Sequence, residues 1–281
     1  MEIFHHFGFS ISGNSERRLF AEAGLELRSE EMRGEELRDG TNPFPSAVGD
    51  AVSFEIAEND PRWFDAKRLA GRFRATDTVW TRFSQAELDA ADFLRIIPHE
   101  PQGDPDAWCD RTSLAKSFDF SRRCQRCGIG RKQVRPFRLR DSPRLTNQLM
   151  RLHWVPDEIL VAYETWAATF RRLGVQCRPV VLEGSDEVIE SVVQLEISEH
   201  VGLRSSPADF TVCGLCLRPR STLSMDGFFP KPVYTDAPVF KSKEYFVSDA
   251  GPYSLVFVSK VMYTTLKIAG VRGMDFYPCR R

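Results

Sequence analysis

The sequence contains no long apolar run and no excess of charge of either sign. No stretch approaches the ~20 apolar residues of a membrane-spanning helix, and the first residues, MEIFHHFGFSIS, lack a basic segment followed by an apolar run. Lys and Arg total 38 against 39 Asp and Glu, so the formal net charge of -1 supplies no global field to attract nucleic acid or anionic membranes. We therefore expect a cytoplasmic protein with no membrane partner, which recognises any charged partner locally.

The sequence also lacks the short motifs that mark common active sites. It contains no G-x-S-x-G, P-loop or H-E-x-x-H pattern, and none of its five histidines has a partner at metal-ligand or catalytic-triad spacing. The adjacent carboxylates Asp157 and Glu158 are predicted to lie in the first turn of a helix, where the helix dipole accounts for them. These observations favour a protein that is not an enzyme.

Seven cysteines are present, and four of them form two C-x-x-C pairs. In a reducing compartment this pattern favours metal or redox chemistry over a disulfide framework. Cys109, Cys177 and Cys279 remain outside the pairs. Cys177 and Cys279 lie in or beside strand-like runs, so we expect each to be a small buried hydrophobic residue.

The two pairs are predicted to bind one structural zinc ion together. Zn²⁺ prefers four tetrahedral ligands, and each C-x-x-C turn can supply two thiolates. Residues 128–212 separate the pairs, which is far longer than the spacing of a compact zinc finger, but the entropic cost of loop closure grows only logarithmically with length. The predicted ligands are Cys124, Cys127, Cys213 and Cys216.

Two alternatives remain for these cysteines, namely two independent redox pairs and buried thiols without metal. A thioredoxin-type pair opens a helix, whereas glycine or proline interrupts the residues that follow Cys127 and Cys216. Four thiolates leave no open coordination position, so a catalytic zinc is also disfavoured.

Apolar periodicity and turn residues predict an α+β fold with mixed or antiparallel sheets and flanking helices. The Pro-, Gly- and Asp-rich segment 98–122 suggests a boundary between an N-terminal α+β region, 1–117, and a zinc-stapled domain, 118–281. Predicted strands are 2–11, 51–57, 77–83, 134–140, 145–154, 179–182 and 191–198, and predicted helices are 15–24, 61–71, 84–95 and a long helix from Pro156 to Gly174. The C-terminal segment 253–278 is predicted to form a strand, a helix capped by Ser259 and ended by Gly270, and a final strand.

A basic segment, residues 122–151, surrounds and follows the first cysteine pair. Ten of its residues are basic and only Asp141 is acidic. Beside a zinc site this suggests nucleic-acid binding, with Phe137 and Trp154 as stacking partners, or an acidic protein partner. The simpler interpretation is an edge strand at 134–140, because Pro136 is excluded from a sheet centre and Arg138 and Arg140 then lie on its solvated face. The basic residues are Arg122, Arg123, Arg126, Arg131, Lys132, Arg135, Arg138, Arg140, Arg144 and Arg151.

The second half of the chain resembles the double-CxxCG motif immunity proteins of bacteria, best known as paralogues in myxobacteria. The resemblance spans roughly residues 118–278 and is one of architecture. It is carried by Cys124 to Gly128, Cys213 to Cys216, the run Gly227-Phe228-Phe229-Pro230, and LVFVSKVMYTTLKIAGVRGMDFYP. Leu217 stands where the second motif has glycine, and the N-terminal region is longer than the family leads us to expect.

This resemblance implies a protein that binds and neutralises a cognate toxin passed between kin cells, with zinc holding the fold together. The expected function is therefore that of a non-enzymatic zinc-binding immunity protein with a protein partner. The alternative is a zinc-ribbon-type nucleic-acid-binding factor that uses the basic segment 122–151, whose affinity would fall steeply with added salt. A third alternative is an enzyme with an unrecognised site in the N-terminal half.

Overall fold

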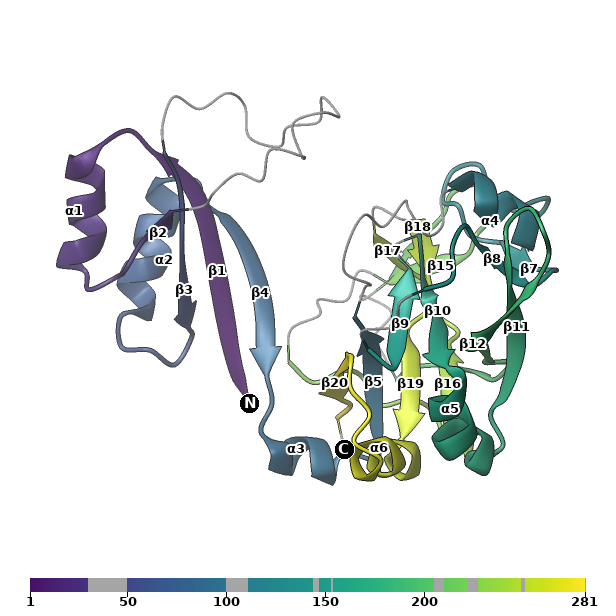
Figure 1. Ribbon diagram of the computed structural model, residues 1–281. Coiled ribbons are helices and arrows are strands. Elements are labelled where there is room, and N and C mark those ends of the chain that lie inside the picture. Colours follow the sequence, from purple (N-terminus) through teal and green to yellow (C-terminus); the bar gives the residue numbers. More distant parts are fainter. Residues whose placement is uncertain are drawn as a thin grey trace. The chain divides into compact units, whose positions relative to one another are not determined.

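The computed structural model (Figure 1) describes residues 1–29, 50–99, 111–143, 147–152, 154–204, 210–221, 227–248 and 251–280. The chain divides into two units, Met1–Ser84 with Met225–Gly227, and Gln85–Ser224 with Phe228–Arg281. This division falls after Ser84 and not at the expected 117/118, because residues 93–98 form a strand of the second unit. No helix among the described residues is long and apolar enough to cross a membrane.

The first unit is a four-stranded antiparallel sheet with two helices on one face (Figure 1). Alternate side chains of the first strand, including Phe7, Phe9 and Ile11, pack against Phe20 and Trp63 from the two helices. The sheet order is β2-β3-β1-β4. The elements are β1 (Glu2–Ile11), α1 (Asn14–Glu22), β2 (Arg28–Ser29), β3 (Asp50–Ala57), α2 (Trp63–Arg72) and β4 (Thr76–Arg82).

The second unit contains two five-stranded sheets, both of them mixed. Their orders are β8-β11-β12-β10-β9 and β13-β16-β19-β5-β20, with parallel pairs at β8·β11 and β13·β16. The first sheet comprises β8 (Phe137–Leu139), β9 (Leu149–Leu152), β10 (Val155–Ala162), β11 (Gln176–Leu182) and β12 (Val188–Glu196). The second comprises β5 (Phe93–Pro98), β13 (His200–Val201), β16 (Val239–Ser242), β19 (Val256–Ser259) and β20 (Met274–Pro278).

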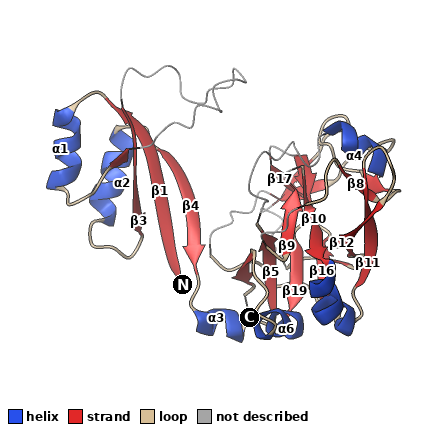
Figure 2. Ribbon diagram, viewed as in Figure 1, coloured by secondary structure: helices blue, strands red, loops and turns tan. Residues whose placement is uncertain are grey.

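Helices and three two-stranded ribbons complete the second unit (Figure 2). The helices are α3 (Gln85–Ala90), α4 (Arg111–Ser117), α5 (Tyr163–Thr165), a π-helical turn (Trp166–Phe170), a 3-10 turn (Arg171–Leu173) and α6 (Lys260–Ile268). The ribbons are β6 (Phe118–Asp119) with β7 (Lys132–Gln133), β14 (Phe210–Val212) with β15 (Pro219–Ser221), and β17 (Phe246–Ser248) with β18 (Gly251–Tyr253).

The main core of the second unit includes side chains from both five-stranded sheets. Ile159 and Val161 of β10 lie in one cluster with Val258 of β19 and Leu266 of α6. Leu160 belongs to a separate cluster on the opposite face of β10. Strand β10 is therefore buried on both of its faces.

This double burial explains an error in the predicted helix that begins at Pro156. Residues 155–162 form β10, and only 163–173 are helical, ending at Gly174 with φ 79° as expected. A strand buried on both faces carries a continuous apolar run, which periodicity alone does not distinguish from a buried helix. Helix 84–95 is likewise too long, because it ends at Ala90 and β5 begins at Phe93.

The C-terminal segment folds as predicted. Ser259 Oγ accepts a hydrogen bond from the Met262 N–H at 3.3 Å, and Gly270 lies after α6 with φ 63°. β19 and β20 both pair antiparallel with β5, so they lie parallel to each other on either side of it. The predicted strands 2–11, 51–57 and 77–83, and helices 15–24 and 61–71, are also present with small shifts at their ends.

Replacing Ser259 with Ala should destabilise the second unit by about 1 kcal/mol, because one N–H at the start of α6 loses its acceptor. Urea unfolding followed by circular dichroism measures this change. Thr265→Ala on the same helix is the matched control, since its exposed hydroxyl donates only to the Val261 carbonyl one turn earlier and its loss should change stability by less than about 0.5 kcal/mol. Equal effects of the two substitutions would contradict the capping role.

Candidate metal centre

Each C-x-x-C pair lies in the turn of a two-stranded antiparallel hairpin. β6 and β7 flank the first pair, with Phe118 opposite Gln133. β14 and β15 flank the second pair, with Val212 opposite Pro219. We call residues 118–133 and 210–221 the first and second hairpins. Strand pairing closes the base of each hairpin, so both cysteines of a pair project from one tight bend.

The two turns have the same backbone hydrogen bonds. The N–H of the first cysteine donates to the carbonyl five residues later, from Cys124 to Ile129 at 2.9 Å and from Cys213 to Arg218 at 3.1 Å. The N–H of the residue after each pair donates back to the carbonyl of the first cysteine, at 2.8 Å and 2.9 Å. The hairpins therefore present equivalent knuckles, although their sequences differ.

The residue after each pair has a left-handed backbone. Gly128 has φ 74°, which glycine adopts without steric cost, whereas Leu217 adopts φ 58° at the equivalent position. A side chain in this conformation costs roughly 1–2 kcal/mol. Leu217 therefore makes the same turn as Gly128, and it stores strain there.

The four knuckle cysteines come together as predicted. Their Sγ atoms lie within 4.8 Å of one another, with Cys124 and Cys213 3.8 Å apart and Cys127 and Cys216 3.5 Å apart. A tetrahedral ion with bonds of about 2.3 Å to sulfur has sulfur–sulfur edges of about 3.8 Å. These spacings suit one metal ion bound by two thiolates from each hairpin.

Backbone N–H groups of the knuckles favour ionised sulfur at the first cysteine of each pair. The N–H groups of Cys216 and Leu215 lower the pKa of Cys213 to about 6, and those of Cys127 and Arg126 lower the pKa of Cys124. Burial instead raises the pKa of Cys127 to about 12. A divalent cation would offset this cost and displace the thiol proton, so metal binding would release protons.

The remaining described cysteines lie outside this cluster. Cys279 is buried, as expected, and burial raises the pKa of its thiol. Cys177 is half-buried on β11, and burial also raises its pKa. Cys109 lies outside the described residues.

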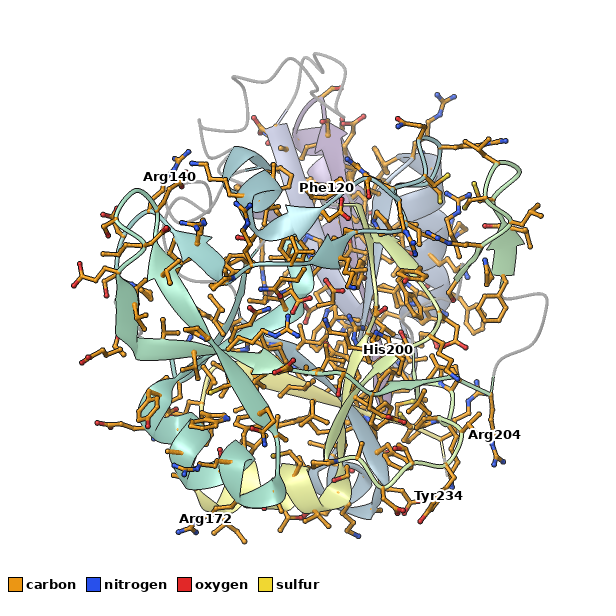
Figure 3. The ribbon with its side chains drawn as sticks, turned by 90° about the vertical axis from the view of Figure 1, so that its right-hand side faces the viewer. Phe120, Arg140, Arg172, His200, Arg204 and Tyr234 are labelled. Atoms are coloured by element: carbon orange, nitrogen blue, oxygen red, sulfur yellow. The ribbon has the colours of Figure 1, made fainter. Side chains whose placement is uncertain are left out.

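The edge strand predicted at 134–140 is present only at residues 137–139, and Arg138 does not lie on a solvated face as expected, because its side chain is only 14% exposed. β8 is at the end of its sheet and pairs only with β11, and Arg140 at its end points outward (Figure 3). Arg138 forms an ion pair with Asp186. Phe137 is only 1% exposed, so it is not available to stack on a base as the nucleic-acid hypothesis expected. Arg144 lies outside the described residues.

A buried polar network that the sequence analysis missed lies next to the first hairpin. Asp157 and Glu158 lie on β10, not in a helical turn, and Lys241 Nζ is 2.8 Å from Glu158 Oε1. Burial alone would lower the pKa of Lys241, but the two carboxylates outweigh it and hold the pKa above its ordinary value. Gln194 donates to Glu158 at 2.8 Å, and Arg131 pairs with Asp157. The sequence signal for this buried network was the presence of two adjacent carboxylates inside the apolar run VPDEILVA.

His5 also has partners that sequence spacing did not reveal. Its Nδ1 lies 2.9 Å from Asp77 on β4, and its Nε2 lies 3.1 Å from Glu58 just after β3. The buried imidazole thus links three strands of the first unit.

Comparison with known proteins adds no family assignment. A scan against protein-family models finds no match, and searches of curated proteins and of solved structures find none either. The arguments about the site therefore rest on its own geometry and chemistry.

Protein purified without added metal should contain about one metal ion per chain, and a Cys124→Ser, Cys213→Ser double variant should contain none, because each hairpin loses one sulfur. Elemental mass spectrometry gives both the amount and the element. Cys177→Ser is the matched control and should retain the ion. A metal-free parent whose thiols oxidise in pairs would contradict the shared site and favour the redox alternative.

Leu217→Gly should stabilise the protein by about 1 kcal/mol, because glycine relieves the left-handed strain. Gly128→Ala should destabilise the protein, because the added Cβ would lie 3.0 Å from Pro252 Cδ and the backbone has a φ of 74°. Chemical denaturation of the metal-loaded variants compares the two. A loss of stability in Leu217→Gly would show that the leucine side chain contributes more to folding than its backbone costs.

Proposed function

We propose that this chain is a non-enzymatic binding protein held together by one structural zinc ion. The observation that carries the proposal is the closed set of four sulfurs from two equivalent knuckles. Four thiolates suit Zn²⁺, and they leave no coordination position for a substrate or a reactive water. The ligands would be Cys124, Cys127, Cys213 and Cys216, and the zinc ion would neutralise thiolate charge and fix the two hairpins.

Within this class, we propose a cytoplasmic immunity protein that binds and neutralises a cognate bacterial toxin. The proposal rests on the resemblance described from sequence, whose aromatic run packs in part against the C-terminal strands. Phe229 of the Gly-Phe-Phe-Pro run is buried, edge-on to Phe257 of β19 and to Tyr277 of β20. The aromatic run and the C-terminal strands thus share one core.

An enzymatic role finds weaker support in the second unit. A cavity of about 450 Å³ is lined mainly by apolar groups, including Ala90, Ala91 and Phe228, and it also contains Cys279 and Arg280. Burial raises the pKa of the Cys279 thiol, which disfavours the thiolate that a nucleophilic cysteine needs. The cavity therefore lacks an activated thiol.

Nucleic-acid binding is the second candidate, and one observation favours it. Arg122, Arg123, Arg126 and Lys132 of the first hairpin are all exposed beside the cysteine cluster. The burial of Phe137 removes one of the two expected stacking partners, so any such binding would depend mainly on phosphate contacts. A nucleic-acid-binding chain would bind single-stranded oligonucleotides with an affinity that falls steeply as salt is added.

The immunity proposal predicts the outcome of a mixed culture. Cells that naturally encode the chain should, after deletion of its gene, be killed by their unmodified parents, because the incoming toxin meets no binding partner. Colony counts measure survival, and the intact gene should restore it. The Cys124→Ser, Cys213→Ser variant should not, since the hairpins are no longer joined.

Equal survival of deleted and parental cells would contradict the immunity proposal. In that case, tight oligonucleotide binding with a steep salt dependence would favour the nucleic-acid alternative. The metal content of the purified chain is measured separately, so the zinc site and the immunity role can fail independently.

A further inference from the structure

The second hairpin exposes three apolar side chains around its cysteine pair. Val212 is 61% exposed, Leu215 is 63% exposed and Leu217 is 74% exposed. Val212 ends β14, Leu215 lies between the two cysteines, and Leu217 follows them directly. Apolar side chains gathered at one turn and open to water are typical of a surface that contacts another protein.

Folding does not account for the leucine at position 217. Its backbone is strained, as described above, while its exposed side chain buries little apolar surface in return. The equivalent position in the first hairpin is Gly128, which makes the same turn without strain. A strained residue whose side chain does little for the fold points to a role in recognition.

One basic side chain of the first hairpin, that of Arg126, borders this turn. Arg126 is exposed, and its Nη1 lies only 2.8 Å from the place where a Cβ on Gly214 would be, so it reaches the turn of the second hairpin. Arg122 and Arg123 are also exposed. Asp119 is the only acidic residue in the two hairpins, and it is hydrogen bonded to Ser121.

We propose that this knuckle surface, formed by Val212, Leu215 and Leu217 with Arg126, docks an acidic segment of a partner protein that carries an apolar side chain. The charge favours an acidic partner and opposes a second copy of the same basic surface. The inference rests on the proposed binding function and names the place where binding occurs. The leucines would supply apolar contact, and Arg126 would attract and align the acidic segment.

Defined peptides test this docking without knowledge of the natural partner. The probe is a fluorescent peptide in which two leucines lie between runs of glutamate, and its controls replace the leucines with serine or the glutamates with lysine. Fluorescence anisotropy with the metal-loaded full chain measures binding. The leucine–glutamate peptide should bind about tenfold or more tightly than either control, because it alone offers both contacts.

Leu217→Gly is the decisive variant, because it should weaken peptide binding about tenfold or more while raising stability and retaining the metal. Arg126→Glu should weaken binding similarly. Ile268→Ser and Arg172→Glu are matched controls that alter an exposed apolar and an exposed basic residue elsewhere in the second unit, and binding should remain unchanged (Figure 3 labels Arg172).

The same variants separate the surface from the broader function in the mixed culture. Loss of protection by Leu217→Gly, with the parent chain protective, would support the knuckle surface. Full protection by Leu217→Gly, or peptide binding unaffected by it, would overturn this surface and leave the immunity proposal intact. If the parent chain fails to protect, the immunity proposal alone is overturned. The peptide-binding measurements then test the knuckle surface by themselves.

Binding of a different partner at the knuckle surface, either a second copy of the chain or nucleic acid, would also overturn the proposal. Concentration-dependent dimerisation lost in Leu217→Gly, measured by analytical ultracentrifugation, would assign the surface to a second copy of the chain. Binding of a single-stranded oligonucleotide that displaces the peptide and exceeds its affinity would assign it to nucleic acid.

Discussion

The convergence of two distant C-x-x-C turns on one point is the constraint on which the second unit depends. Residues 128–212 lie between the pairs and contain all five strands of the sheet β8-β11-β12-β10-β9. Closing so long a loop costs little more than closing a short one, since each doubling of length adds only about 0.6 kcal/mol. A structural zinc ion contributes about 10 kcal/mol or more, so it can hold the two hairpins around an inserted sheet.

The hairpins connect to the core through Arg131, which follows the first knuckle. Its guanidinium pairs with Asp157 on β10 and donates to the Trp154 carbonyl. Lys241 on β16 of the other sheet approaches the same carboxylate pair, 2.8 Å from Glu158. Buried charges of this kind are costly unless all are paired, so displacing one strand would leave a partner charge buried and unpaired. The knuckle, the two sheets and this network therefore constrain one another.

The features predicted correctly from sequence are those set by local chemistry. The cysteine cluster was predicted from the two C-x-x-C turns. The edge position of β8 was predicted from Pro136, which precedes it. The ends of α6 were predicted from Ser259 and Gly270. The features missed depend on tertiary context. β10 reads as a helix because both of its faces are buried, and the pairing of Asp157 with Arg131 is visible only once distant segments have folded together. Leu217 combines a correct and a missed prediction. The turn after Cys216 was predicted from the C-x-x-C pair, whereas the left-handed backbone of Leu217 was not.

X-ray absorption at the zinc edge of the purified full chain tests the central claim most directly, because it reports the atoms bound to the metal. A single zinc ion held by the two hairpins predicts a shell of four sulfurs at about 2.3 Å, with no nitrogen or oxygen in it. A shell with nitrogen or oxygen ligands, or the absence of zinc from protein with intact thiols, would contradict the structural four-cysteine site.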